Sequence, residues 1–160
     1  MTEPRLSTDE LRQLYRELIL DHARQPRHFG ALGNATHSAE GLNPLCGDKL
    51  RLYLRVSGDS EIADASFEGS GCAISVASAS LLTDTVIGMS SEQALELTDA
   101  LVCRLTGGRS AQSNAREPEL GRLRALEGVR EFPARVKCAT LAWHALRSAV
   151  ANDKSIASTE

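Results

Sequence analysis

In the stretch KLRLYLRV at residues 49–56, apolar and polar side chains alternate strictly. One face of the predicted strand carries Leu50, Leu52, Leu54 and Val56, which is typical of a strand with one buried side. The sequence SGDS at 57–60 indicates a turn. Residues 62–68 continue as a second strand, and its buried face carries Ala63, Ala65 and Phe67. The two stretches therefore predict a β-hairpin that packs one face against a core.

Helices are predicted on both sides of this hairpin in the sequence. They span 9–24, 73–87, 91–105 and Pro133 to about 150, with a short helical piece at 119–127. We expect residues 31–45 to be loop with room for a short strand, residues 106–118 to form a flexible surface excursion, and the tail at 151–160 to fray. A helix, then strands, then helices, without repeat or linker, predicts a single α+β domain over residues 1–160.

Length and composition narrow the classes of function. The 160 residues are the size of one domain, and 42% hydrophobic residues are enough for a packed core. A net charge of −3 gives no attraction to nucleic acid or to an anionic membrane, and 4% aromatic residues leave few platforms for stacking bases. The start lacks the apolar segment of a signal peptide, and the longest apolar runs are too short to span a membrane. We therefore expect a cytoplasmic protein that binds neither nucleic acid nor a membrane.

Four cysteines in a reducing compartment indicate metal or thiol chemistry rather than disulfides. The absence of any CxxC pair argues against thioredoxin-type motifs and zinc ribbons. Cys46 and Asp48 precede the first hairpin strand and Cys72 follows the second, so antiparallel pairing brings all three to one end. Cys138, in the first turns of the last helix, must be delivered by packing. The helix dipoles at Cys72 and Cys138 favour the thiolate form.

Two kinds of cofactor suit this set of ligands. Three thiolates and one carboxylate suit tetrahedral zinc, and thiolates equally suit iron–sulfur clusters. Zn²⁺ with these four ligands has a net charge of 2 − 4 = −2, which requires a nearby cation. Arg135, three residues before Cys138 on the same helical face, is the candidate. The alternative is that the cysteines are buried packing residues, and we prefer it for Cys103 in the ordinary amphipathic segment ALVCRL.

Four stretches of the chain carry a family resemblance. They are YRELILDHARQPRHFG (15–30), NPLCGD (43–48), FEGSGCAISVASASLLT (67–83) and FPARVKCATLAWHAL (132–146). In this order they resemble the first helix and the three cysteine motifs of the NifU N-terminal/IscU-type iron–sulfur assembly proteins. The resemblance implies the SufE/NifU N-terminal (IscU-like) fold, a three-stranded antiparallel sheet packed by helices. It also implies zinc held by Cys46, Asp48, Cys72 and Cys138, with Arg135 as a supporting charge.

Two departures from the IscU pattern place the resemblance in the SufU branch of that family. IscU-type proteins have a histidine immediately before the last cysteine, where this chain has Lys137. The segment between Cys72 and Cys138 is also longer than in IscU-type proteins. The extra length falls in about 106–126 and is taken as a SufU-type insertion.

The resemblance implies a zinc-dependent sulfur carrier, or sulfurtransferase, of iron–sulfur cluster assembly. A SufS-type cysteine desulfurase would hand persulfide sulfur to Cys46, which would pass it to a SufBCD-type assembly complex. Two other hypotheses stay open. One is a non-enzymatic scaffold that builds a transient [2Fe–2S] cluster on Cys46, Cys72 and Cys138, and the other is a domain whose zinc is purely structural. Lys137 weighs against the scaffold, because the usual histidine ligand is missing.

Overall fold

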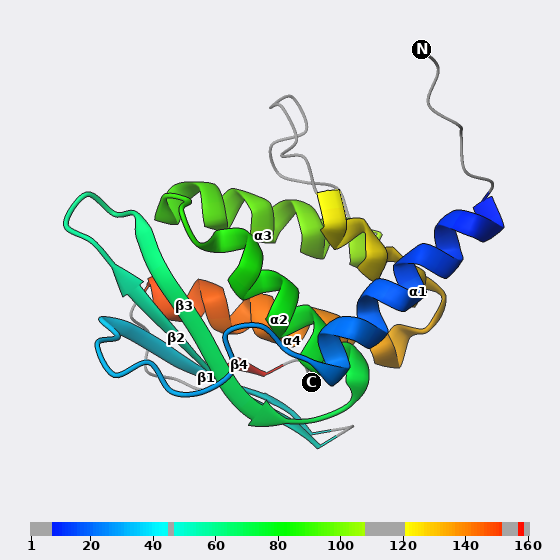
Figure 1. Ribbon diagram of the computed structural model, residues 1–160, viewed down its shortest axis with the longest axis horizontal. Coiled ribbons are helices and arrows are strands. Elements are labelled where there is room, and N and C mark those ends of the chain that lie inside the picture. Colours follow the sequence, from blue (N-terminus) through cyan, green and yellow to red (C-terminus); the bar gives the residue numbers. More distant parts are fainter. Residues whose placement is uncertain (1–7, 45–46, 108–120, 152–156, 159–160) are drawn as a thin grey trace, which may run out of the picture.

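Helices gather on one face of a small sheet (Figure 1). The computed structural model describes residues 8–44, 47–107, 121–151 and 157–158. In chain order the elements are α1 (Thr8–Arg24), β1 (His37–Asn43), β2 (Asp48–Val56), β3 (Ile62–Ser70), α2 (Ala73–Val86), α3 (Ser91–Thr106), the 3₁₀ helix η1 (Gly121–Glu131), α4 (Pro133–Val150) and β4 (Ala157–Ser158). The strands lie in the order β3-β2-β1-β4. The predicted α+β class is confirmed: β1, β2 and β3 form an antiparallel sheet, and β4 adds a short parallel strand to its edge.

The predicted hairpin lies at the centre of this arrangement. β2 and β3 pair antiparallel, with Leu52 opposite Phe67 and Lys49 opposite Ser70. Leu52 is fully buried against the helices, whereas Lys49 and Arg51 on the other face are exposed. The pairing places the start of β2 beside the end of β3, as the sequence predicts. This end of the sheet is the one at which the candidate site forms.

Hydrogen bonds between two buried helices fix the position of α4. This helix packs against β1, β2 and α2, and it carries Trp143, which is fully buried. The indole Nε1 of Trp143 donates a hydrogen bond to Ser78 Oγ of α2 at 3.1 Å. Ser78 Oγ in turn donates to the backbone carbonyl of Ala139 at 2.5 Å. Because Ala139 directly follows Cys138, these two hydrogen bonds also help to fix the position of Cys138.

β1 is longer than the sequence indicates, since it takes seven residues of the stretch expected to be mainly loop. Its inward-facing residues are Ala39, Gly41 and Asn43. They are too small or too polar to give an alternating apolar pattern. Gly41 faces α4 so closely that an added Cβ would lie 3.1 Å from Leu141 Cδ1. The close approach of α4 therefore explains why this strand lacks the usual signal.

The predicted frayed tail over 151–160 needs correction. Within it, Ala157–Ser158 form β4 and pair in parallel with Gly41 and Leu42 of β1. The outer edge of β1 presents unpaired backbone N–H and C=O groups, and an added strand satisfies them. Edge pairing of this kind depends on backbone groups alone, so no side-chain pattern announces it.

The region between α3 and α4 also differs from the prediction in part. The short helical piece expected at 119–127 is the 3₁₀ helix η1, over Gly121–Glu131. Residues 108–120, which hold most of the predicted excursion and of the expected insertion, lie outside the described residues. No helix in the described part of the chain combines the length and apolar character needed to cross a membrane.

Gly69, near the end of β3, is a position that admits no side chain. Its φ is +148°, and an added Cβ would lie 2.2 Å from the carbonyl oxygen of Lys49 and 2.7 Å from Leu50 Cα. We expect Gly69→Ala to lower the free energy of unfolding by about 1–3 kcal/mol or more, through backbone strain and separation of the strands. Denaturant unfolding measures this, with Gly58→Ala as control because nothing lies within 4 Å of a Cβ there. Equal losses in the two variants would contradict the expectation.

Candidate metal site

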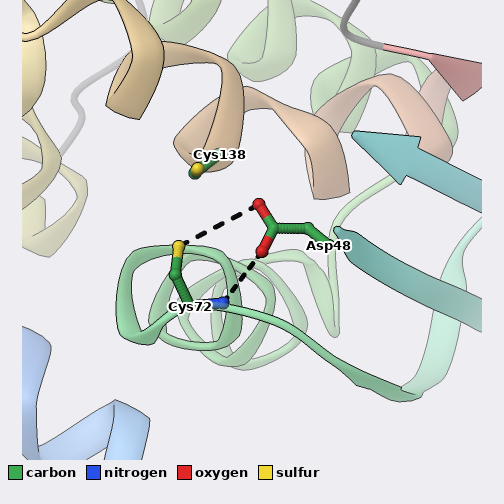
Figure 2. A group of neighbouring side chains, drawn as sticks. All are labelled: Asp48, Cys72 and Cys138. Carbon is green, nitrogen blue, oxygen red and sulfur yellow. Dashed lines mark hydrogen bonds between the residues drawn. The ribbon is translucent and has the colours of Figure 1, made fainter. Parts of the chain in front are cut away.

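Asp48 anchors the candidate metal site. It is the first residue of β2 and is fully buried. Its Oδ1 accepts a hydrogen bond from the backbone N–H of Cys72 at 2.8 Å, and its Oδ2 accepts one from Asn43 Nδ2 at 3.3 Å. A buried carboxylate needs such donors, because removing it from water without them is costly. Figure 2 shows the result: the carboxylate is held with Oδ2 facing the sulfurs of Cys72 and Cys138.

Cys72 occupies the N-cap position of α2, where the sequence predicts it. Its Sγ accepts a hydrogen bond from the backbone N–H of Ser75 at 3.4 Å. The first turn of a helix has unpaired N–H groups and a positive dipole end, and both stabilise negative charge on this sulfur. Cys72 is half-buried, and its Sγ lies 4.0 Å from Asp48 Oδ2.

Cys138 reaches the same point from α4. Its side chain is fully buried. Its thiol lies 3.6 Å from the carbonyl oxygen of Ala134, to which it donates, and its Sγ accepts from Asn43 Nδ2 at 3.5 Å. The helix packing through Ser78 and Ala139 delivers it, as the topology requires.

Asn43 is the site residue that the sequence reasoning missed. It is fully buried at the end of β1 and stands directly opposite Asp48 in the pairing of β1 with β2. Its amide nitrogen contacts both Asp48 and Cys138. Asn43 belongs to the NPLCGD motif. That its side chain points inward follows only from the register of β1, a strand that the sequence does not clearly predict. From sequence alone, an Asn followed by Pro, three residues before Cys46, indicates a turn.

The arrangement fits a metal ion. Asp48, Cys72 and Cys138 offer ligand atoms that all lie within 4.8 Å of one another, and they are the one such group of three in the part of the chain described. Tetrahedral Zn²⁺, with bonds of about 2.0–2.3 Å, separates its ligand atoms by about 3.3–3.8 Å. A small inward movement would therefore close these three atoms around the ion. Sulfur and carboxylate oxygen are donors that zinc accepts.

Arg135 supplies the positive charge predicted beside the ligands. It lies exposed in the first turn of α4. The negative charge of Cys72 raises the pKa of Arg135, and a hydrogen bond with Cys138 raises it further. The guanidinium therefore interacts with both sulfurs from the solvent side, and its positive charge offsets part of their negative charge.

The other two cysteines, Cys46 and Cys103, are not part of the described ligand group. Cys46 lies outside the described residues, although the flanking strand residues Asn43 and Asp48 are paired across β1 and β2. Cys103 is half-buried on α3 and does not belong to the ligand group. His22 of α1 is buried, with its Nδ1 2.7 Å from Ser80 Oγ of α2.

Known proteins are similar to this chain in sequence and in fold. The NifU-like N-terminal domain family matches residues 14–139. This chain belongs to that family. Among its relatives, a protein of Bacillus subtilis (strain 168) named zinc-dependent sulfurtransferase SufU is 43% identical over 141 residues, or 88% of this chain and 92% of the relative. A protein of Streptococcus pyogenes serotype M1, named iron–sulfur cluster assembly scaffold protein IscU, is 41% identical over 145 residues, or 91% and 87%.

Solved structures of this NifU-like family agree with the fold. A candidate iron–sulfur cluster assembly scaffold protein for the SUF system, from thermophilic Fervidobacterium islandicum AW-1, has a TM-score of 0.72 and 34% identity. The match covers 86% of this chain and 97% of that one. The N-terminal part of a nitrogen-fixing NifU-like protein from Brucella abortus also has a TM-score of 0.72, at 26% identity, over 89% and 96% of the two chains. The expected NifU N-terminal fold is thus confirmed.

Gly71 tests the geometry of this site, because an added Cβ there would lie 2.5 Å from Asp48 Oδ1. We expect Gly71→Ala to turn the carboxylate away, break its bond with the Cys72 N–H, and weaken zinc binding about 10–100-fold. Competition with a chromophoric chelator measures the affinity. Gly33→Ala is the control, since nothing lies within 4 Å of a Cβ at that position. Unchanged affinity in Gly71→Ala would show that this orientation of Asp48 does not matter for metal binding.

Proposed function

We propose that this protein works in iron–sulfur cluster assembly as a zinc-bound sulfur acceptor. It would take persulfide sulfur from a SufS-type cysteine desulfurase and pass it to a SufBCD-type complex. The observation that carries the proposal is the convergence of Asp48, Cys72 and Cys138 beside the motif that contains Cys46. The relative named zinc-dependent sulfurtransferase SufU, alike over most of both chains, supports the same reading.

Zinc would be held by Cys46, Asp48, Cys72 and Cys138. When bound, it would keep the thiols deprotonated at neutral pH. The protein's own groups support that charge state. The N–H of Ser75 donates to Cys72, and the Arg135 guanidinium lies beside both Cys72 and Cys138. Each of these contacts stabilises negative sulfur.

Cys46 is the proposed acceptor. Its thiolate would attack the outer sulfur of the desulfurase persulfide. One S–S bond forms on Cys46, one breaks on the desulfurase, and the desulfurase cysteine leaves as a thiolate, so no external oxidant or reductant is needed. Cys72 caps the start of α2 and Cys138 lies within α4, whereas Cys46 comes between β1 and β2 in the sequence. The ligand on a strand connection is the one that can leave with least disturbance of the core.

A scaffold for a transient [2Fe–2S] cluster is the second candidate function. It is favoured by the relative named iron–sulfur cluster assembly scaffold protein IscU, which matches 91% of this chain. The same cysteines would be the ligands. Lys137 stands against it, because an ammonium group adds no ligand where an imidazole would. Anaerobic reconstitution that gives a cluster transferable to an apo-ferredoxin would favour the scaffold over the sulfur acceptor.

Removal of the acceptor thiol tests the proposal. We expect Cys46→Ala to abolish both the acceleration of desulfurase turnover and the transfer of ³⁵S from labelled cysteine to this protein. Cys103→Ala is the matched control, because Cys103 lies on α3 apart from the ligand group, and it should behave as the wild type. Both readouts are measured with a purified SufS-type desulfurase.

A Cys46→Ala variant that still accelerates turnover and still receives labelled sulfur would refute this function. A Cys46→Ser variant that unfolds, as judged by circular dichroism, would instead support purely structural zinc. The SufBCD-type acceptor and the cytoplasmic location stay predictions.

A further inference from the structure

The side chain of Asn43 contacts two of the candidate ligands, Asp48 and Cys138. Its carboxamide is fully buried, and its nitrogen lies 3.3 Å from Asp48 Oδ2 and 3.5 Å from Cys138 Sγ. An amide nitrogen carries two hydrogens, which is one for each of these acceptors. The side chain therefore connects a strand ligand with a helix ligand across the interior of the site.

The orientation of this carboxamide follows from its neighbours. With oxygen and nitrogen exchanged, the amide oxygen would face a carboxylate oxygen and a sulfur that carry negative charge in the metal-bound state. Such a contact is repulsive, so the nitrogen must face the ligands. In this orientation Asn43 Oδ1 is buried and finds no hydrogen-bond partner in the part of the chain described.

A buried oxygen without a hydrogen-bond partner among the described residues is a cost that a residue used only for packing would avoid. A Leu of similar size would fill the same space at the end of β1 without any unsatisfied polar atom. The presence of Asn indicates that its two donors compensate for the buried oxygen. Their targets are two of the candidate ligand atoms.

We propose that Asn43 is a positioning residue, which by donating to both Asp48 Oδ2 and Cys138 Sγ holds these two ligands in register for the metal. The inference rests on the proposed function in one respect, that these ligands bind zinc. Asp48 also receives the Cys72 N–H, and Cys72 Sγ receives the Ser75 N–H. With Asn43 included, each of the three described ligand atoms accepts an N–H donor.

The hydrogen bond from Asn43 affects the electronic state of the Cys138 sulfur. A hydrogen bond to a thiolate withdraws charge from sulfur and lowers the energy of its lone pairs. A metal–thiolate charge-transfer transition from that sulfur then needs more energy. Loss of the Asn43 donor should therefore move such a transition to longer wavelength, which a change in folding stability alone would not do.

Co²⁺ is the probe for this test, because it occupies tetrahedral sulfur and oxygen sites as zinc does and gives visible and charge-transfer bands. The metal-free full-length protein is titrated with Co²⁺, and zinc affinity is measured by chelator competition. We expect Asn43→Leu to shift the sulfur-to-cobalt band to longer wavelength and to weaken zinc binding about 10–100-fold. Asn34→Leu is the control, because Asn34 is an exposed loop residue, and it should match the wild type in both readouts.

Asn43→Ser serves as the second variant if Asn43→Leu fails to fold by circular dichroism. A short hydroxyl cannot bridge both acceptors, so the same direction of change is expected. A folded variant with wild-type band position and wild-type affinity would overturn the inference, even if its melting temperature were lower. Wild-type protein without any thiolate–cobalt band would overturn both this inference and the zinc-bound acceptor, whereas failure of sulfur transfer alone would leave the cobalt result intact.

Discussion

The hydrogen bond from the Cys72 backbone N–H to Asp48 Oδ1, 2.8 Å long, is the interaction on which the site depends. It joins the first residue of β2 to the start of α2, so the hairpin between them must close at this point. Burial makes the bond obligatory, because a carboxylate removed from water needs donors. The close approach also explains Gly71, where any side chain would collide with the same oxygen. This contact therefore fixes the positions of Asp48 and Cys72 relative to each other.

Hydrogen bonds and helix packing within the protein hold the three described candidate ligands together. Backbone N–H groups donate hydrogen bonds to Asp48 and Cys72, and the packing of α4 on α2 brings Cys138 into place. Arg135 offsets negative charge from outside. Such preorganisation lowers the cost of gathering like charges, which would otherwise repel one another. It also suits a site in which one ligand, Cys46, is proposed to leave while the others stay.

The parts of this structure that follow from strong periodicity could be predicted from the sequence. The alternation over 49–56 predicts β2, and the topology of a hairpin brings Asp48 and Cys72 together. The location of Cys72 at a helix start follows from the glycines before it. These predictions succeed because they depend on local pattern and on one turn.

The rest depends on packing between distant segments, which a single sequence does not display. The residues of β1 that face α4 are small or polar, so the strand lacks the alternating apolar pattern. Without that pattern, the sequence does not reveal that Asn43 points inward. β4 pairs with β1 through backbone groups, which nearly every residue type has, so its side chains give no signal. Cys138 needs the fit of α4 on α2 through Ser78.

The most direct test of the account is the metal content of the protein as purified without added metal, read together with its absorbance spectrum. Mass spectrometry of the eluted metal should give about one zinc ion per chain, and the solution should be colourless, because zinc has no visible transitions. A brown protein that contains iron and acid-labile sulfide in place of zinc would contradict the account and establish the scaffold instead.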